Sequence, residues 1–356
     1  MVAHNRRASP ADRDSEILRD VIHTFISSGE PVSSRTVAKL EHHGLSSASI
    51  RNVMADLEDQ GLLAQPYKSA GRVPTASGYH FYIDSLMPSK AISEPNRRLI
   101  EGELQSVLSD VEKLMEVVTH LLTQLSNQIG IVVTPPVGET VLKAISFVKL
   151  SGCRTLCVMV SVGGLAENRV IETLHEMSRE ELVRISNYLT ESFSGLTLRQ
   201  IRDKLLGLMA QERAQLDEML ADAMDLAQQA LGADETPGLL VEGTDVVLGQ
   251  PELSDLPRVR RLIETFTDKA DLVRMLAQLI GGEGVRVIIG EDSDLTSDLD
   301  FSLVATTYGS KEHALGSLGV FGPSRMDYQK VVPLVSFLGM TLGQTLHAST
   351  DDETEE

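Results

Sequence analysis

Residues 33–72 constrain the fold of this chain more than any other stretch, because they predict two short helices followed by a β-hairpin. Ser33 or Ser34 stands where the first helix needs a cap, since the first amides of a helix have no partner within it. Ser46 can cap the second helix in the same way, and Gly61 can end that helix. The stretch therefore predicts a helix-turn-helix with a β wing.

The second helix has two contrasting sides. Its apolar residues recur at helical spacing and predict a single buried stripe, made of Ile50, Val53, Met54 and Leu57. The other side of its N-terminal half carries small hydroxyl groups, an arginine and an asparagine: Ser47, Ser49, Arg51 and Asn52. Arginine reads guanine and asparagine reads adenine with paired hydrogen bonds, so this side suits the DNA major groove.

The predicted wing is free of acidic residues. Residues 62–64 and 72–73 predict its strands around a turn at residues 69–71, and no Asp or Glu occurs from Gly61 to Ile83. A basic hairpin beside a reading helix would hold phosphates and set the register of the protein on the duplex. A small helical core with ordinary solvated faces, or a protein-binding unit, would also fit this pattern.

Two roles are expected for the candidate DNA-binding residues. Arg51 and Asn52 are expected to contact bases, with Ser47 and Ser49 beside them. The remaining residues would bind phosphates, enter the minor groove or cap the reading helix. The full candidate set is Arg35, Ser46, Ser47, Ser49, Arg51, Asn52, Tyr67, Lys68 and Arg72.

The charge distribution agrees with DNA binding although the net charge of −19 does not. Residues 1–90 contain ten Lys or Arg and ten Asp or Glu, so the excess negative charge lies entirely in the remaining residues. A neutral front on an acidic body would repel DNA everywhere except at the intended face, which favours specific over non-specific binding.

A heptad pattern follows the predicted winged helix. Apolar residues alternate at spacings of four and three from Ile100 to Leu125, which is typical of a helical seam: Ile100, Leu104, Val107, Val111, Leu114, Val118, Leu121 and Leu125. The seam could pair with a second copy or lie on the next domain. We favour the second option because Pro135 and Pro136 soon turn the chain back.

The rest of the chain predicts an α+β body. Candidate strands at residues 143–174 and 284–322 flank a helical block, which fits either two α+β domains or one sheet domain with a helical insertion. We favour the insertion, because neither half supplies enough strands for a good sheet alone. The expected divisions are a disordered arm at 1–11, the winged helix at 12–86, a sheet domain at 91–197 and 281–348, an inserted domain at 198–280, and an acidic tail at 349–356.

Catalysis is not expected of this chain. No nucleophile, metal-binding or phosphate-binding motif survives inspection, so we assign no catalytic residue, metal or cofactor. No apolar run is long enough to cross a bilayer and no apolar segment follows Met1, so we expect a cytoplasmic protein without a membrane partner.

Two runs carry a resemblance to a known family. Residues 46–63, SSASIRNVMADLEDQGLL, and residues 65–84, QPYKSAGRVPTASGYHFYID, closely resemble the start of the bacterial heat-inducible transcription repressor HrcA family. Residues 316–320, GSLGV, and 322–328, GPSRMDY, give a second match far downstream. The polar start and the acidic tail depart from the family pattern.

The resemblance implies a fold and a function. The fold would be α+β, with an N-terminal winged helix-turn-helix and a GAF-like domain interrupted by a mainly helical inserted domain that makes a homodimer. The function would be repression of heat-shock chaperone operons through the inverted-repeat operator called CIRCE. A GroEL-type chaperonin would keep the repressor active, and heat would release it from DNA. The alternative is a ligand-sensing winged-helix regulator of a metabolic operon.

Overall fold

The structure of the chain is a computed structural model. It describes residues 10–40, 44–88, 91–107, 111–134, 141–162, 166–173, 175–211, 238–248, 256–267, 284–292, 300–309 and 314–351, with isolated residues at 222–223, 226–227, 229, 276 and 296. Within these ranges, no helix combines the length and the apolar character needed to cross a membrane. The expected arm and tail lie mostly outside them, although helix α1 already begins at Pro10 and the last helix continues to Asp351.

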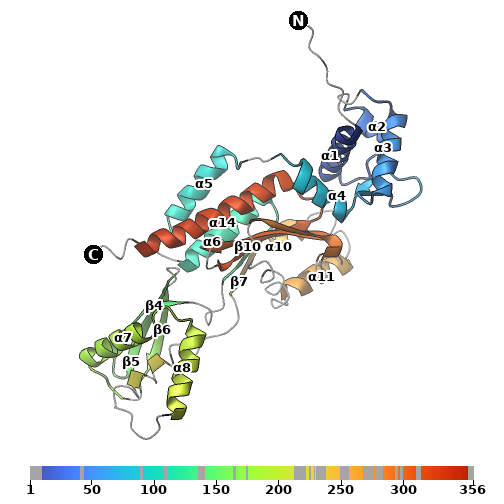
Figure 1. Cartoon of the computed structure of the whole chain (residues 1–356). Helices are drawn as coiled ribbons and strands as arrows, with labels where there is room; N and C mark the ends of the chain where they lie inside the picture. Colours follow the sequence, from blue (N-terminus) through green and yellow to red (C-terminus); the bar gives the residue numbers. More distant parts are fainter. Residues whose placement is uncertain are drawn as a thin grey trace.

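The described part of the N-terminal unit begins with three helices and a short antiparallel pair of strands. The helices are α1 (Pro10–Ser28), α2 (Ser34–Ala38) and α3 (Ser47–Asp59), and the strands are β1 (Leu63–Ala64) and β2 (Val73–Pro74). Strands β1 and β2 pair with each other, as the sequence predicted. We call residues 10–88 the reading unit; Figure 1 shows it at one end of the molecule.

Local signals set the ends of these helices. The Ser33 hydroxyl accepts a hydrogen bond from the Thr36 amide at 3.2 Å, and the Ser46 hydroxyl accepts one from the Ser49 amide at 3.1 Å. Gly61 follows α3 with a φ of +75°, a conformation that costs glycine little. The predicted caps at Ser33 and Ser46 and the predicted stop at Gly61 are therefore confirmed.

A third extended segment joins the hairpin, and the sequence patterns did not predict it. Val32 and Arg72 form an antiparallel bridge, each amide donating to the other residue's carbonyl at 2.8 Å. The bridge brings the chain so close to Gly71 that a Cβ there would lie 2.4 Å from the Val32 carbonyl oxygen. Gly71 is therefore required by a close backbone approach.

The heptad seam forms two helices, α5 (Glu94–Gln105) and α6 (Val111–Ser126), where the pattern suggested one. Ile100, Leu114 and Leu121 are buried in an apolar core that also contains residues of the last helix, α14 (Tyr328–Asp351). The seam therefore lies on the domain that follows the reading unit, which is the option that the sequence favoured. Helix α4 (Ala76–Phe81) and the following helical turn η1 (Tyr82–Leu86) end the reading unit and lead into α5.

The body is built on a five-stranded antiparallel sheet of order β7-β3-β10-β9-β8. The strands are β3 (Ile129–Val133), β7 (Leu239–Glu242), β8 (Arg286–Ile289), β9 (Phe301–Gly309) and β10 (Ala314–Pro323). One face packs on α5, α6 and α14, and the other packs on Val247 of α10 (Thr244–Leu248), Val259 of α11 (Leu256–Thr267) and Leu276. The sheet is therefore covered on both faces (Figure 1).

A second sheet stands apart from the first. Strands β4 (Leu142–Ser151), β5 (Arg154–Ser161) and β6 (Ala166–Glu172) pair only with one another among the described strands. They share a separate apolar core with α7 (Arg179–Phe193) and α8 (Leu198–Gln211). In Figure 1 this unit lies at the end of the molecule opposite the reading unit.

The prediction of one sheet made from both groups of strands is therefore wrong. The strands that complete the larger sheet are β3 and β7 instead of β4–β6. In the sequence, β3 and β7 lie on either side of the segment that forms the small sheet. A division at residue 198 would separate α7 from α8 although Leu189 and Ile201 are buried in the same core. The inserted unit thus includes β4–β6 and α7 as well as α8.

The contact at Gly71 generates a stability prediction. Gly71→Ala should lower the free energy of unfolding by about 1–3 kcal/mol, because its Cβ would collide with backbone that cannot move without breaking the bridge. Gly102→Ala is the matched control: it lies within α5 with no atom within 4 Å of the added Cβ, and should stabilise by about 0.5–1 kcal/mol. Urea titrations followed by circular dichroism measure the free energy of unfolding of both variants. Equal effects of the two substitutions would contradict the conclusion that the Val32 backbone requires a glycine at position 71.

Candidate DNA-binding surface

The rotation of α3 is set by its buried stripe. Ile50, Met54 and Leu57 are at most 3% exposed and pack into the core of the reading unit, while Val53 is half-buried. Arg51 and Asn52 are both exposed, because they project from the side of the helix away from the core. The expectation that these two side chains face solvent is confirmed.

The serine hydroxyls at the start of α3 are engaged within the protein. The Ser46 hydroxyl caps the helix and lies 3.0 Å from the Ser49 hydroxyl. Ser47 is half-buried, and its hydroxyl lies 3.1 Å from that of Ser34, which is buried in α2. This contact ties the two helices together at the turn. Among these candidates Ser49 is the exposed residue nearest Arg51 and Asn52.

The tip of the hairpin presents Tyr67 and Lys68 to solvent. The Tyr67 side chain is 63% exposed and Lys68 is also exposed. Gln65 holds the turn beneath them: its amide donates to the carbonyl of Ala70 at 2.9 Å and to that of Lys68 at 3.3 Å. Sequence patterns missed Gln65, because a glutamine that braces a turn has no distinctive spacing.

Arg72 is placed differently from the other candidates. Its guanidinium lies 2.7 Å from a carboxylate oxygen of Glu58 on α3, and its side chain is only 18% exposed. The pair joins the base of the hairpin to the end of α3. The negative charge of Glu58 is therefore neutralised by Arg72.

The exposed cations among the candidate residues come from three different elements. Arg35 lies in α2, Arg51 in α3 and Lys68 at the hairpin tip, and all three are exposed. A helix that exposes arginine and asparagine, flanked by cations on neighbouring elements, matches what a polyanionic duplex requires of its reader. Such a unit, joined to an α+β body, defines the class of DNA-binding transcription regulators.

Comparison with known proteins identifies the family. The family model described as "HrcA protein C terminal domain" matches residues 112–332. A heat-inducible transcription repressor HrcA of Geobacter sulfurreducens is 38% identical over 336 residues, covering 94% of this chain and 98% of that protein. A namesake from Syntrophobacter fumaroxidans is 34% identical over 342 residues, covering 96% and 98%. The chain belongs to the HrcA family.

A solved structure supports the fold. The crystal structure of a hypothetical protein superposes with a TM-score of 0.66 at 22% identity, covering 95% of this chain and 99% of that one. The mixed helix and sheet architecture is therefore that of a known protein. The names of the curated relatives favour a heat-inducible repressor over the ligand-sensing alternative.

Proposed function

We propose that this chain is a sequence-specific repressor of heat-shock chaperone operons, which binds an inverted-repeat operator as a homodimer in the cytoplasm and leaves it on heat stress. The observation that carries the proposal is the exposure of Arg51 and Asn52 in the N-terminal half of α3, in a unit whose hairpin tip also exposes Lys68. Family membership adds the class of operon, because the relatives are named heat-inducible repressors.

In this proposal α3 lies in the major groove. Arg51 would donate two hydrogen bonds to guanine, and Asn52 would pair with the edge of adenine. Ser49 is close enough along the exposed side to reach a base edge or a phosphate. Ser46 and Ser47 would act by holding the N-terminal end of α3 in place, because their hydroxyls already bond within the reading unit.

The flanking cations would hold the DNA backbone. Arg35 and Lys68 would neutralise phosphates on either side of α3. The hydroxyl of Tyr67 would donate a hydrogen bond to a phosphate, or the side chain would enter the minor groove. Arg72 was expected to join them. Its ion pair with Glu58 and its low exposure favour a different role, in which it anchors the hairpin from below.

We also propose the finer fold assignment. Three helices followed by a hairpin, with Val32 adding a third extended segment, agree with a winged helix-turn-helix. An antiparallel five-stranded sheet with helices on both faces agrees with a GAF-like domain. The segment with β4–β6 interrupts that domain between β3 and β7.

The inserted unit offers a surface for the homodimer. Val148, Leu150 and Val170 are 46–48% exposed, and Val148 and Val170 flank Leu156 across the three paired strands. They alternate with the residues that face α7, so they share the outer face of the sheet. Apolar, self-complementary faces are typical of two-fold dimers, and a two-fold dimer requires an inverted-repeat operator.

A GroEL-type chaperonin is the proposed second partner. Family resemblance suggests that it keeps the repressor competent to bind the CIRCE operator and that heat withdraws this help. A protein whose stability is marginal loses its DNA-binding form on modest warming, so such an arrangement is physically reasonable.

The direct test is a mobility shift on upstream regions of chaperone operons. The purified chain should retard a fragment that contains the inverted repeat, and unlabelled fragment of the same sequence should compete far better than scrambled DNA. Adding chaperonin should raise the fraction that binds after mild heating. Equal competition by scrambled DNA would refute the proposed sequence specificity.

Arg51→Ala should cost about 1–3 kcal/mol of binding free energy on the operator and relax the preference at one base pair. The reason is the loss of a bidentate contact that only one base satisfies. Fluorescence anisotropy with single-base operator variants measures both effects. Arg179→Ala, an exposed arginine on the inserted unit, is the control and should bind like wild type. An equal loss on random DNA would make Arg51 a phosphate contact.

Lys68→Ala should weaken binding to all sequences alike and reduce the slope of log affinity against log salt by about one unit. Arg72→Ala should leave that slope unchanged and lower the free energy of unfolding, because Arg72 pairs with Glu58. Salt titrations of binding and urea titrations of folding separate the two. A reduced slope for Arg72→Ala would return Arg72 to the phosphate contacts.

A further inference from the structure

The reading unit meets the body through a hydrogen-bonded triangle. The side-chain amide of Gln329, in the first turn of α14, donates to the Tyr82 hydroxyl at 2.8 Å and lies 3.0 Å from the His23 Nε2. The Tyr82 hydroxyl and His23 Nε2 are 2.8 Å apart. Because burial raises the pKa of Tyr82, its hydroxyl keeps its proton as a donor. We call these three residues the Gln329 clamp.

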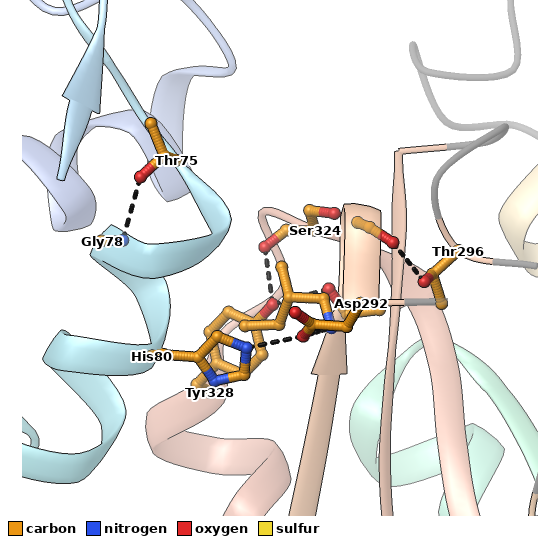
Figure 2. Close-up of polar contacts among 10 residues, drawn as sticks. Thr75, Gly78, His80, Asp292, Thr296, Ser324 and Tyr328 are labelled. Carbon is orange, nitrogen blue, oxygen red and sulfur yellow. Dashed lines mark hydrogen bonds and ion pairs between the residues drawn. The ribbon is translucent and has the colours of Figure 1, made fainter. Parts of the chain in front are cut away.

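A second polar contact joins the reading unit to the sheet edge. His80 of α4 places its Nε2 2.6 Å from the Oδ2 of Asp292, which follows strand β8 (Figure 2). The same Asp292 oxygen accepts a hydrogen bond from the Ile289 amide at 2.8 Å, so the carboxylate is held at the end of the strand. We call His80 and Asp292 the His80 clamp.

An aromatic contact accompanies the two clamps. The rings of Tyr79 and Tyr328 lie 5.5 Å apart, and both side chains are buried. Tyr328 is itself fixed, because its hydroxyl donates to the Ser324 carbonyl at 2.8 Å and lies 2.8 Å from the Ser302 hydroxyl (Figure 2). The reading unit is thus held through α1, α4 and η1 against α14 and the edge strand β8. Contacts from several elements resist rotation about more than one axis.

We propose that His80, Asp292 and Gln329 are positioning residues for DNA recognition, which fix the orientation of each reading unit on the body. This inference rests on the proposed function. In a two-fold dimer, the two α3 helices reach successive half-sites only if both units are held at the required angle and separation. When one reading unit is bound, a rigid connection gives the second unit a high effective concentration at a half-site of one particular spacing. A loosened connection lowers that concentration and distributes the second unit over many spacings.

The exposure of the His80 clamp supports a role in orientation. Its two side chains are 35% and 38% exposed, and polar contacts between side chains with that much solvent contact contribute little to overall stability. The same pair can still matter for orientation, because it lies at the junction between the reading unit and the body. A small rotation at this junction would move the distant side chains of α3 by a much larger distance.

The experiment compares operator duplexes that differ only in the separation of their half-sites. The probes are a single half-site, the inverted repeat at its natural spacing, and a repeat lengthened by about five base pairs, or half a helical turn. The test protein is the full chain with His80→Ala and Gln329→Ala combined, checked by circular dichroism and thermal unfolding. His80→Gln is the conservative variant, since its amide can still donate to Asp292.

His120→Ala is the matched control. His120 Nδ1 lies 2.7 Å from an oxygen of Glu242, so this variant loses the same type of contact between a histidine and a carboxylate. That pair joins α6 to β7 within the body and does not involve the reading unit.

Wild type, His80→Gln and His120→Ala should prefer the natural spacing clearly. The double variant should lose about tenfold or more in affinity for that probe. This loss is a part of the roughly hundredfold to ten-thousandfold increase in affinity that linking two binding units can supply. Its affinities for the two spacings should converge, and its affinity for the half-site should stay at the wild-type value.

An unchanged spacing preference in the double variant would overturn the inference. It would also be overturned if half-site affinity fell as far as full-site affinity, because the contacts would then act within the reading unit. If wild type did not distinguish the operator from random DNA, the proposed function would fail and this inference with it.

Discussion

Burial of one face of α3 is the constraint on which the candidate site depends. The side chains of Ile50, Met54 and Leu57 are removed from water, and burial of each stabilises the folded state by about 1.5–3 kcal/mol. Turning the helix by one residue would expose part of this stripe and bury charged groups instead. Arg51 and Asn52 therefore face outward because their neighbours face inward, so the exposure of these two candidate DNA-contacting side chains follows from a packing requirement.

The same packing continues into the body. One apolar core contains Ile17 of α1, Ile50 of α3, Leu121 of α6 and Leu338 of α14, so the reading unit is not merely tethered by a linker. Polar contacts at its edges, made by Gln329 and His80, add direction to an apolar contact that has little of its own. Apolar burial stabilises the contact between the reading unit and the body, but it is not directional. Hydrogen bonds fix the relative orientation of the two parts, because their strength depends steeply on geometry.

The inserted unit is organised independently. Strands β4–β6 and helices α7 and α8 share a core of their own, while the chain before and after the unit provides the neighbouring strands β3 and β7 of the larger sheet. An insertion between two adjacent strands leaves their pairing intact, since both ends of the insertion lie at the same end of the antiparallel pair, where Val133 pairs with Leu239. The body can therefore carry a separately folded unit without losing its own fold.

Sequence alone determined the features that depend on residues within about one helical turn. The caps at Ser33 and Ser46, the stop at Gly61 and the exposure of Arg51 and Asn52 all follow from spacing and local hydrogen bonding. Tertiary structure decided which strands pair, why Gly71 must lack a side chain, and that Arg72 binds Glu58. These features join residues far apart in the chain, and strand patterns alone do not specify a partner, because any strand with the right alternation offers the same hydrogen-bonding edge.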